Sequence, residues 1–524
     1  MFVGVETTAP VQPIRARFGA ALVLDVSALR NIFFGALMLM TVTVLIGRPT
    51  VFSDTDDYYS QGHSVVRALQ RWVQKAKPPF DLSEAHYRLT NPEAADEEPE
   101  HNQDGARSVY YGVLLYATQA IGSLWLLAGI QALAAAALVR LLWRRVAQSA
   151  GLGGGSDRGY LLAMAALSLG SSLPVFTGFA MPDVFAGFAA VTTVLVVIYG
   201  DSFGRWSKAG LWLLLAACIN FHGSNLPTSL GVTALGLFGL ALMKTDWKKL
   251  AFRAGFVLSA AVVALMAAKA YGLAVRLRTG DELGRPPFLT ARVLADGPGR
   301  AYLAHVCGQS PPPFQVCAFR RLPLNNTEDI LWADEPELGI FNSSEYPVRL
   351  RLVHEDARFA LAAVLYQPGQ ELVAALKNWG AQLSSFDLGE SLKDPGYYLA
   401  DPYWKTTHLP RLIQGTGHCD PEQGNCAVRA PRNGLSGLFV LTAGLGLLAA
   451  AACVARHLLA GRGRELKADL GVWAASLLIL AVPINAAVCG MLSGPFARYQ
   501  MRMLWLIPLA AMLLVALMRR ARRA

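Results

Sequence analysis

Three acidic residues that could act as a general base follow the first apolar stretch of the chain. Asp54, Asp56 and Asp57 lie within four residues, and Tyr58 follows them directly. A carboxylate here can take a proton from an acceptor hydroxyl or amine, or it can bind a divalent cation through its oxygen atoms. A solvated acidic turn that caps a surface helix gives the same pattern. The sequence leaves all three interpretations open.

Further polar residues stand at the ends of later apolar stretches. Asp183 follows Met181 and Pro182, so it can cap the next helix or belong to a site. His222 lies in a polar break between two apolar stretches and can bind a phosphate oxygen, orient a carboxylate or ligate a metal. Asn225, in the same break, can offer hydrogen bonds or cap the following helix.

Arg498 and Arg502 are the residues best suited to hold a phosphate. They lie four residues apart, with Tyr499 between them, and can therefore share one helix face. A guanidinium group binds phosphate through a fork of two N–H groups. The alternative is that both side chains reach lipid headgroups from a span end.

The composition places these residues in an all-α polytopic membrane protein. Of 524 residues, 53% are hydrophobic and 16% are charged, whereas a soluble chain carries roughly a quarter charged residues. A spanning helix needs ~20 mostly apolar residues. We expect about ten spans, near residues 31–47, 109–139, 159–180, 183–199, 210–220, 227–243, 251–273, 434–455, 469–489 and 501–518.

Basic residues orient these spans. Arginine and lysine gather in every second connection and in the C-terminal tail, as the positive-inside rule predicts. Both termini are therefore expected in the cytoplasm, and the candidate site residues on the outer side. The rule also accounts for the net charge of +10, so we expect no nucleic-acid partner.

The connections divide the chain into four expected parts. Residues 1–30 form a cytoplasmic segment, 31–274 a membrane module, 275–432 an extracytoplasmic soluble domain, and 433–524 a second membrane module with a basic cytoplasmic tail. The first module contains an outward loop, 48–108, with an amphipathic helix over 64–73 that suits a membrane surface.

Four cysteines of the 275–432 segment form two close pairs, Cys307 with Cys317 and Cys419 with Cys426. Short-range pairs outside the cytoplasm favour local disulfides. Four free thiols or a four-thiolate zinc site are the alternatives, although the spacings suit zinc poorly.

Taken together, these features resemble the GT-C glycosyltransferases. The most similar branch uses polyprenyl-phosphate sugars and includes protein O-mannosyltransferases and lipid A aminoarabinose transferases. Its proposed base is an Asp just after the first span. Asp54 matches that position, although Asp56 or Asp57 fits a shifted register. Residues 179–185, around Asp183, resemble the family's second acidic site, and residues 497–501 resemble its late Arg-Tyr segment near the lipid phosphate.

The resemblance, over 31–273 and 434–518, implies a GT-C-like fold and an inverting sugar transfer to an unknown extracytoplasmic acceptor. The donor would be a polyprenyl-phosphate sugar within the membrane lipids of a bacterial inner membrane. Arg498 or Arg502 would hold its phosphate, with Tyr499, His222, Asn225 and Tyr58 nearby. No cofactor or metal is expected, with Mn²⁺ or Mg²⁺ as the alternative. A transporter or flippase for a lipid or small anion, and a non-catalytic cell-envelope assembly factor, are the rival functions.

Overall fold

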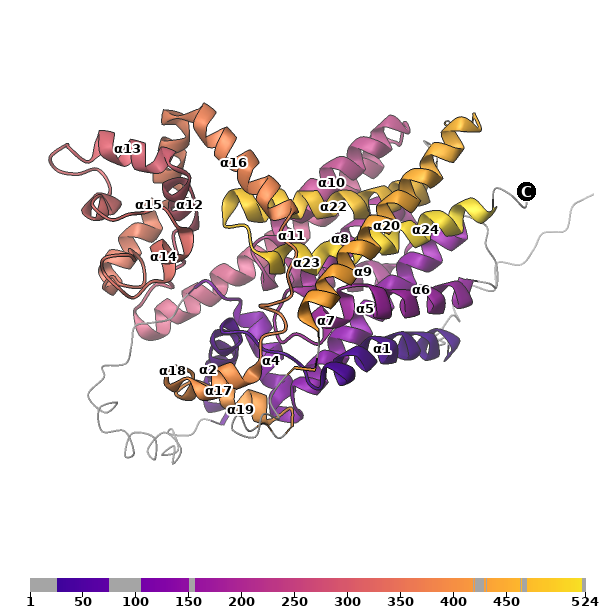
Figure 1. Ribbon diagram of the computed structural model, residues 1–524, viewed down its shortest axis with the longest axis horizontal. Helices are drawn as coiled ribbons and strands as arrows, with labels where there is room; N and C mark the ends of the chain where they lie inside the picture. The colour runs from indigo at the N-terminus through magenta and orange to yellow at the C-terminus, as the bar shows by residue number, and fades with distance from the viewer. Residues whose placement is uncertain are drawn as a thin grey trace, which may run out of the picture.

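The protein is an all-helical integral membrane protein (Figure 1). The computed structural model describes residues 26–74, 105–149, 156–417, 419, 428–429, 431–461, 463 and 469–520. Within them, eight helices are long and apolar enough to cross a membrane, or nine if one bent pair counts as a span. The eight are α1 (Val26–Ile46), α5 (Leu124–Ser149), α8 (Val184–Tyr199), α10 (Asn225–Leu242), α11 (Trp247–Thr279), α20 (Arg432–Leu459), α22 (Leu470–Leu492), and α23 with α24 (Ala497–Leu504 and Leu506–Arg520).

The expected count of about ten spans is too high because two apolar stretches form shorter helices. The stretch 159–180 divides into α6 (Ser156–Gly170) and the short α7 (Leu173–Thr177), which begins beside Pro174. The stretch 210–220 belongs to α9 (Arg205–Phe221), which has 17 residues and ends where His222 turns extended. The long stretch 109–139 is also divided, because α4 (Val109–Ile121) ends at Gly122, before α5 begins. Glycine and proline end helices that hydropathy alone would continue.

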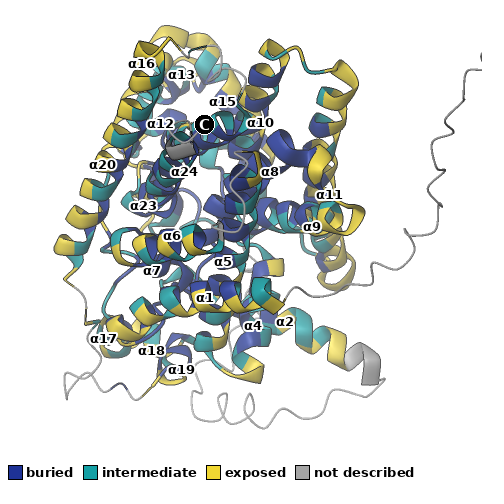
Figure 2. Cartoon of the chain, turned by 90° about the vertical axis from the view of Figure 1, so that its right-hand side faces the viewer, coloured by how far each residue is buried: buried dark blue, intermediate teal, exposed yellow. Residues whose placement is uncertain are grey.

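Helix α8 forms the centre of the bundle. Each of its residues from Val184 to Tyr199 is buried, and α5, α9, α10 and α22 pack around it. A helix that is apolar on every side belongs in such an interior position. The surrounding helices instead expose large apolar side chains, among them Leu213, Phe238, Leu265 and Leu448, as Figure 2 shows for their outer faces. These exposed side chains form the surface that lipid would cover.

The segment after α1 is fixed against the loop before α8. Thr50 forms an isolated parallel bridge with Phe179, and its backbone exchanges hydrogen bonds with Gly178 and Ala180 at 3.0 and 2.8 Å. Helix α2 (Asp54–Gln74) then begins, so the predicted helix over 64–73 is confirmed and extends back to the acidic cluster. The remainder of loop 48–108, residues 75–104, lies outside the described residues.

The segment 275–432 packs in two different ways. Helices α12 (Phe288–Asp296), α13 (Pro298–Val306), α14 (Thr327–Trp332) and α15 (Tyr346–Tyr366) share a small apolar core of their own and lie together at one side of Figure 1. Helix α16 (Pro368–Leu383) leads back to the bundle. Beyond it, α17 (Pro395–Ala400), α18 (Pro402–Lys405) and α19 (Leu409–Gln414) pack on the bundle core. The structure therefore does not show one soluble domain over 275–432, and that boundary stays a prediction.

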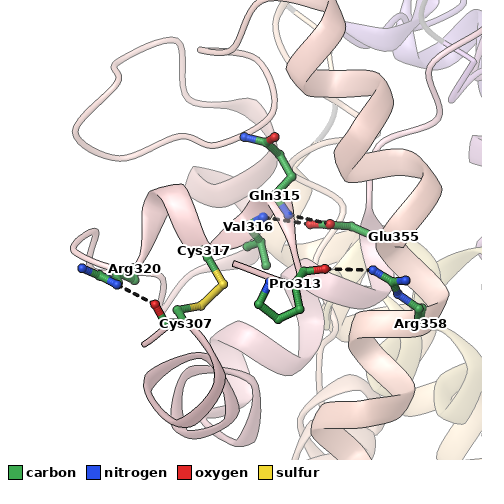
Figure 3. Close-up of a disulfide and its surroundings, with 8 residues drawn as sticks. All are labelled: Cys307, Pro313, Gln315, Val316, Cys317, Arg320, Glu355 and Arg358. Atoms are coloured by element: carbon green, nitrogen blue, oxygen red, sulfur yellow. Dashed lines mark hydrogen bonds between the residues drawn. A yellow bond between two sulfur atoms is a disulfide. The ribbon is translucent and has the colours of Figure 1, made fainter. Parts of the chain in front are cut away.

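The disulfide between Cys307 and Cys317 is confirmed, with 5.4 Å between the Cα atoms. Figure 3 shows how the bridged loop is held against α15. The backbone N–H groups of Gln315 and Val316 donate to the Glu355 carboxylate at 2.6 and 2.8 Å. Arg358 donates to the Pro313 carbonyl at 3.0 Å. The Cys419–Cys426 pair stays a prediction, because Cys426 lies outside the described residues.

Close packing of α2 on α4 positions the acidic cluster. Gly62 and Gly112 face each other, and a Cβ on either glycine would collide with the backbone of the partner helix. Gly112→Val should therefore push α2 away from α4. Overpacking of this kind costs about 1–3 kcal/mol, and we expect a lower unfolding temperature in detergent.

The matched control is Gly129→Val on α5, because a Cβ at Gly129 meets nothing within 4 Å. An unfolding temperature that falls as far for Gly129→Val as for Gly112→Val would show that valine in a helix, rather than the close approach of α2 and α4, causes the loss.

Candidate functional site

Three chain segments that are distant in sequence meet at one end of the bundle. The first turn of α2 contributes Asp54, the residue before α8 is Asp183, and α23 contributes Arg498 and Arg502. The start of α23 is fixed by α16, because the Gln382 side chain bonds both the backbone N–H and the carbonyl of Phe496, at 3.0 and 2.7 Å. The sequence placed these segments on one face, and the structure brings their side chains into contact.

Arg502 is a fully buried side chain that holds the segments together. Its Nη1 donates to Asp183 Oδ1 at 3.2 Å. Its Nη2 donates to Ser224 Oγ at 2.7 Å and to Asn485 Oδ1 at 3.2 Å. These contacts join α23 to the starts of α8 and α10 and to the interior of α22. Arg502 is thus largely occupied by the protein itself.

Arg498 is also buried, but its hydrogen-bonding capacity is not used in the same way. Its Nε lies 3.7 Å from carboxylate oxygens of both Asp183 and Glu390, and its Nη2 lies 4.0 Å from Asp54. The guanidinium plane stacks over Phe52 at 4.3 Å. Its Nε and Nη1 donate no hydrogen bond to any described residue. A buried guanidinium group with unpaired N–H groups is costly unless an acceptor reaches it.

Asp54 bridges two arginines. Its Oδ1 lies 2.7 Å from Arg107 Nη2, and its Oδ2 faces Arg498. Arg107 comes from the chain just before α4, and it also stacks over Trp332 of α14, 5.4 Å from the ring centroid. Sequence reasoning missed Arg107 because it stands in a polar segment with no motif around it. Asp57 lies more loosely beside Arg107, at 3.7 Å, and its side chain is half exposed.

Two further carboxylates from the 275–432 segment were also missed. Burial raises the pKa of Glu390, and the charges of Asp183 and Asp54 raise it further against the opposing effect of Arg498. Glu328 is an exposed residue, but desolvation by the surrounding protein, and then the charges of Asp54 and Glu390, raise its pKa to about 6. The only available signal was that acidic residues recur in this segment.

Asp183 and Asp56 have different roles from each other. The side chain of Asp183 makes no capping hydrogen bond to α8, so the capping interpretation is wrong. Instead Asp183 is 1% exposed and lies between Arg498 and Arg502. Asp56 Oδ1 accepts the backbone N–H of His408 at 2.7 Å, with His408 Nδ1 at 3.3 Å. Asp56 therefore ties α2 to the start of α19, and none of its contacts with described residues involves Arg498 or Arg502.

The other predicted residues surround this cluster at different distances. His222 Nδ1 shares a 2.8 Å hydrogen bond with Ser224, and its ring lies 5.7 Å from that of Tyr499. Burial, and then the positive charge of Arg502 and Arg498, holds the pKa of His222 well below its usual range. The Tyr499 ring lies under both guanidinium groups, at 5.4 and 4.6 Å.

Asn225 and Tyr58 take structural positions. Asn225 donates to the carbonyl of Cys218 at 2.7 Å and so joins α10 to α9. Tyr58 packs edge-on against Tyr111 of α4, and burial raises its pKa above the usual range. Neither side chain has a hydrogen bond to the arginines among the contacts of the described residues.

Among the described residues, no group of three or more His, Cys, Asp or Glu side chains is arranged to hold a metal ion. Comparison with protein family models, with curated proteins and with solved structures finds no match to this chain.

The contacts of Arg502 predict that it supports the fold. Arg502→Met leaves Asp183 with a single arginine in a buried place and removes the bonds to Ser224 and Asn485. Breaking a buried ion pair from one side costs about 3–5 kcal/mol. We expect a large fall in the unfolding temperature of the purified protein.

Arg205→Met is the matched control, since Arg205 is exposed at the start of α9 and stacks on Trp206 at 5.2 Å. It should leave the unfolding temperature nearly unchanged. Equal stability of the Arg502 and Arg205 variants would contradict the structural role of Arg502.

Proposed function

We propose that the chain is a membrane glycosyltransferase of the GT-C type that takes its sugar from a polyprenyl-phosphate donor. One observation carries the proposal: the buried guanidinium group of Arg498 keeps unpaired N–H groups beside the carboxylates of Asp54 and Asp183. A group that can bind an anion, Arg498, and a candidate base, Asp54, thus lie within one cluster at an end of the bundle.

Arg498 suits the donor phosphate better than Arg502 does. Two N–H groups of Arg498 donate to no described residue, whereas Arg502 already donates to Asp183, Ser224 and Asn485. A guanidinium fork in a low-dielectric place binds a phosphate through short, charge-assisted hydrogen bonds. Tyr499 lies against both arginines and limits where their planes can turn.

Asp54 suits the base better than its neighbours do. Its side chain is 18% exposed and contacts Arg107 and Arg498, so an acceptor hydroxyl can approach it beside the phosphate. Asp56 already accepts a hydrogen bond from the backbone N–H of His408, and Asp183 is enclosed between Arg498 and Arg502.

In the proposed step, Asp54 takes the proton of the acceptor hydroxyl while that oxygen bonds to the anomeric carbon. The bond from the anomeric carbon to the phosphate oxygen breaks from the opposite side, so the configuration inverts. The bonding electrons leave with the polyprenyl phosphate, and Arg498 stabilises the added negative charge.

The charged residues at the two ends of α8 support a transmembrane orientation in which the proposed site faces outward. Asp183 precedes the first residue of α8, and Asp201 follows its last turns, where it pairs with Arg253 at 2.9 Å. The 16 residues of α8 are about 24 Å long, so these two groups lie at opposite ends of the helix. Arg145 lies near the same end as Asp201, stacked on Phe203. Under the positive-inside rule, that basic end faces the cytoplasm, and the Asp54–Arg498 cluster faces outward, in a bacterial inner membrane.

Asp54→Asn tests the base. The variant should insert and bind a polyprenyl-phosphate sugar, but sugar release or transfer should fall by about 100-fold or more, as expected for loss of a general base. The assay uses protein in liposomes with radiolabelled polyprenyl-phosphate sugars, and it measures label that leaves the lipid.

Asp56→Asn is the matched control, because an amide oxygen can still accept the His408 N–H. It should keep most of the activity. Loss in Asp56→Asn together with retention in Asp54→Asn would move the base two residues along the chain.

Chelation tests the role of a metal. The proposed step uses Asp54 and Arg498 and requires no cation, so activity in the same liposomes should survive excess EDTA. Loss on EDTA treatment that Mn²⁺ or Mg²⁺ restores would overturn this and make Asp54, Asp183 and Glu390 candidate ligands.

The same liposomes, when sealed, separate the enzyme from the rival functions. Intact labelled lipid that crosses the bilayer without loss of its sugar would indicate a flippase. Binding without release or crossing would indicate an assembly factor. Labelled sugar freed from the lipid supports the transferase.

A further inference from the structure

Helices α15 and α16 meet in a sharp elbow at Gln367, and their axes are bent by 109°. One face of α15 packs into the small apolar core through Leu352, Phe359 and Ala363. Helix α16 then runs back toward α22 and α23 (Figure 1). The elbow therefore connects the small core to the bundle at the end that holds Asp54 and Arg498.

The elbow exposes an unusual amount of apolar surface. On the α15 side, Leu361 and Leu365 are 60% and 69% exposed, and on the α16 side Leu372, Val373 and Leu376 are 60%, 63% and 48% exposed. Together the two helices are as apolar as a membrane span. Large contiguous apolar surface is rare where a protein meets water and indicates a partner or a membrane.

The position of α16 favours the membrane. The same helix is fixed to a spanning helix: Trp379 Nε1 donates to the Pro483 carbonyl inside α22 at 3.0 Å. A Cβ at Gly490 of α22 would lie 2.6 Å from the Asn378 carbonyl, so the two helices touch without intervening side chains. The exposed leucines of α16 thus lie beside the lipid-facing surface of α22, where Leu480 and Leu492 are also exposed.

We propose that the α15–α16 elbow is inserted in the interfacial layer of the bilayer, at the end of the bundle that holds the Asp54–Arg498 cluster. The lipid acyl chains would cover Leu372, Val373 and Leu376. Lys377 of the same helix is exposed, and lysine is a residue type that anchors helices at the interface. This inference does not depend on the proposed glycosyltransferase activity.

Spin labels on single introduced cysteines test the insertion. Leu372→Cys and Leu376→Cys replace exposed side chains, so neither change opens a core. The labelled full-length protein is placed in phosphatidylcholine–phosphatidylglycerol liposomes, and collisions with O₂, which dissolves in lipid, are compared with those of a water-soluble nickel complex. Leu448→Cys on the outer face of α20 serves as the lipid control, and Glu337→Cys, exposed between α14 and α15, serves as the water control.

Both elbow labels should resemble the lipid control, with O₂ contact several-fold in excess of nickel contact. The wild-type chain, treated with the same label, gives the background from Cys453, which is partly exposed. Labels that resemble Glu337→Cys would overturn the proposal by placing the elbow in water. Labels that neither reagent reaches would also overturn it, because a protein partner or a second copy would then cover the surface.

Discussion

A buried charge cluster is the constraint on which one end of this bundle depends. Asp183, Arg498 and Arg502 lie almost out of contact with solvent, in a protein whose central helix is apolar on every side. Buried charges at a bilayer boundary are tolerated only when they pair. Pairing requires the starts of α8 and α23 to stay together, and the neighbouring loops are then fixed around them.

The two arginines of this cluster are not equivalent, and the difference is what gives the site a functional interpretation. Arg502 donates to Asp183, Ser224 and Asn485 and so acts as a cross-link among helices. Arg498 lies among Asp54, Asp183 and Glu390 at distances longer than hydrogen bonds, with unpaired N–H groups. One arginine cross-links the helices, and the other is the arginine for which we propose a phosphate ligand.

The sequence by itself determined that this is a helical membrane protein, and it identified several of the residues that form the site. Apolar runs predict spanning helices because the bilayer sets their length. Of about ten expected spans, eight correspond to helices of the described residues that are long and apolar enough to cross a membrane. The close spacing of Cys307 and Cys317 predicted their disulfide. Polar groups at span ends are costly without a use, and this position marks Asp54, Asp183 and Arg498 as candidate site residues. Span ends were predicted less well wherever glycine or proline interrupts an apolar run, as at Gly122 and Pro174.

Only the tertiary structure decided which of these residues act together. Asp54 and Asp56 are about 200° apart around the same helix, so Asp54 faces Arg498 and Asp56 faces His408. The sequence alone could not distinguish the two residues, because the start of α2 and its neighbours in space were not known. Arg107 and Glu390 join the cluster from segments far along the chain. Their positions in the cluster depend on long-range packing, such as the close contact of α2 with α4. Local sequence patterns do not indicate which distant segments will pack together.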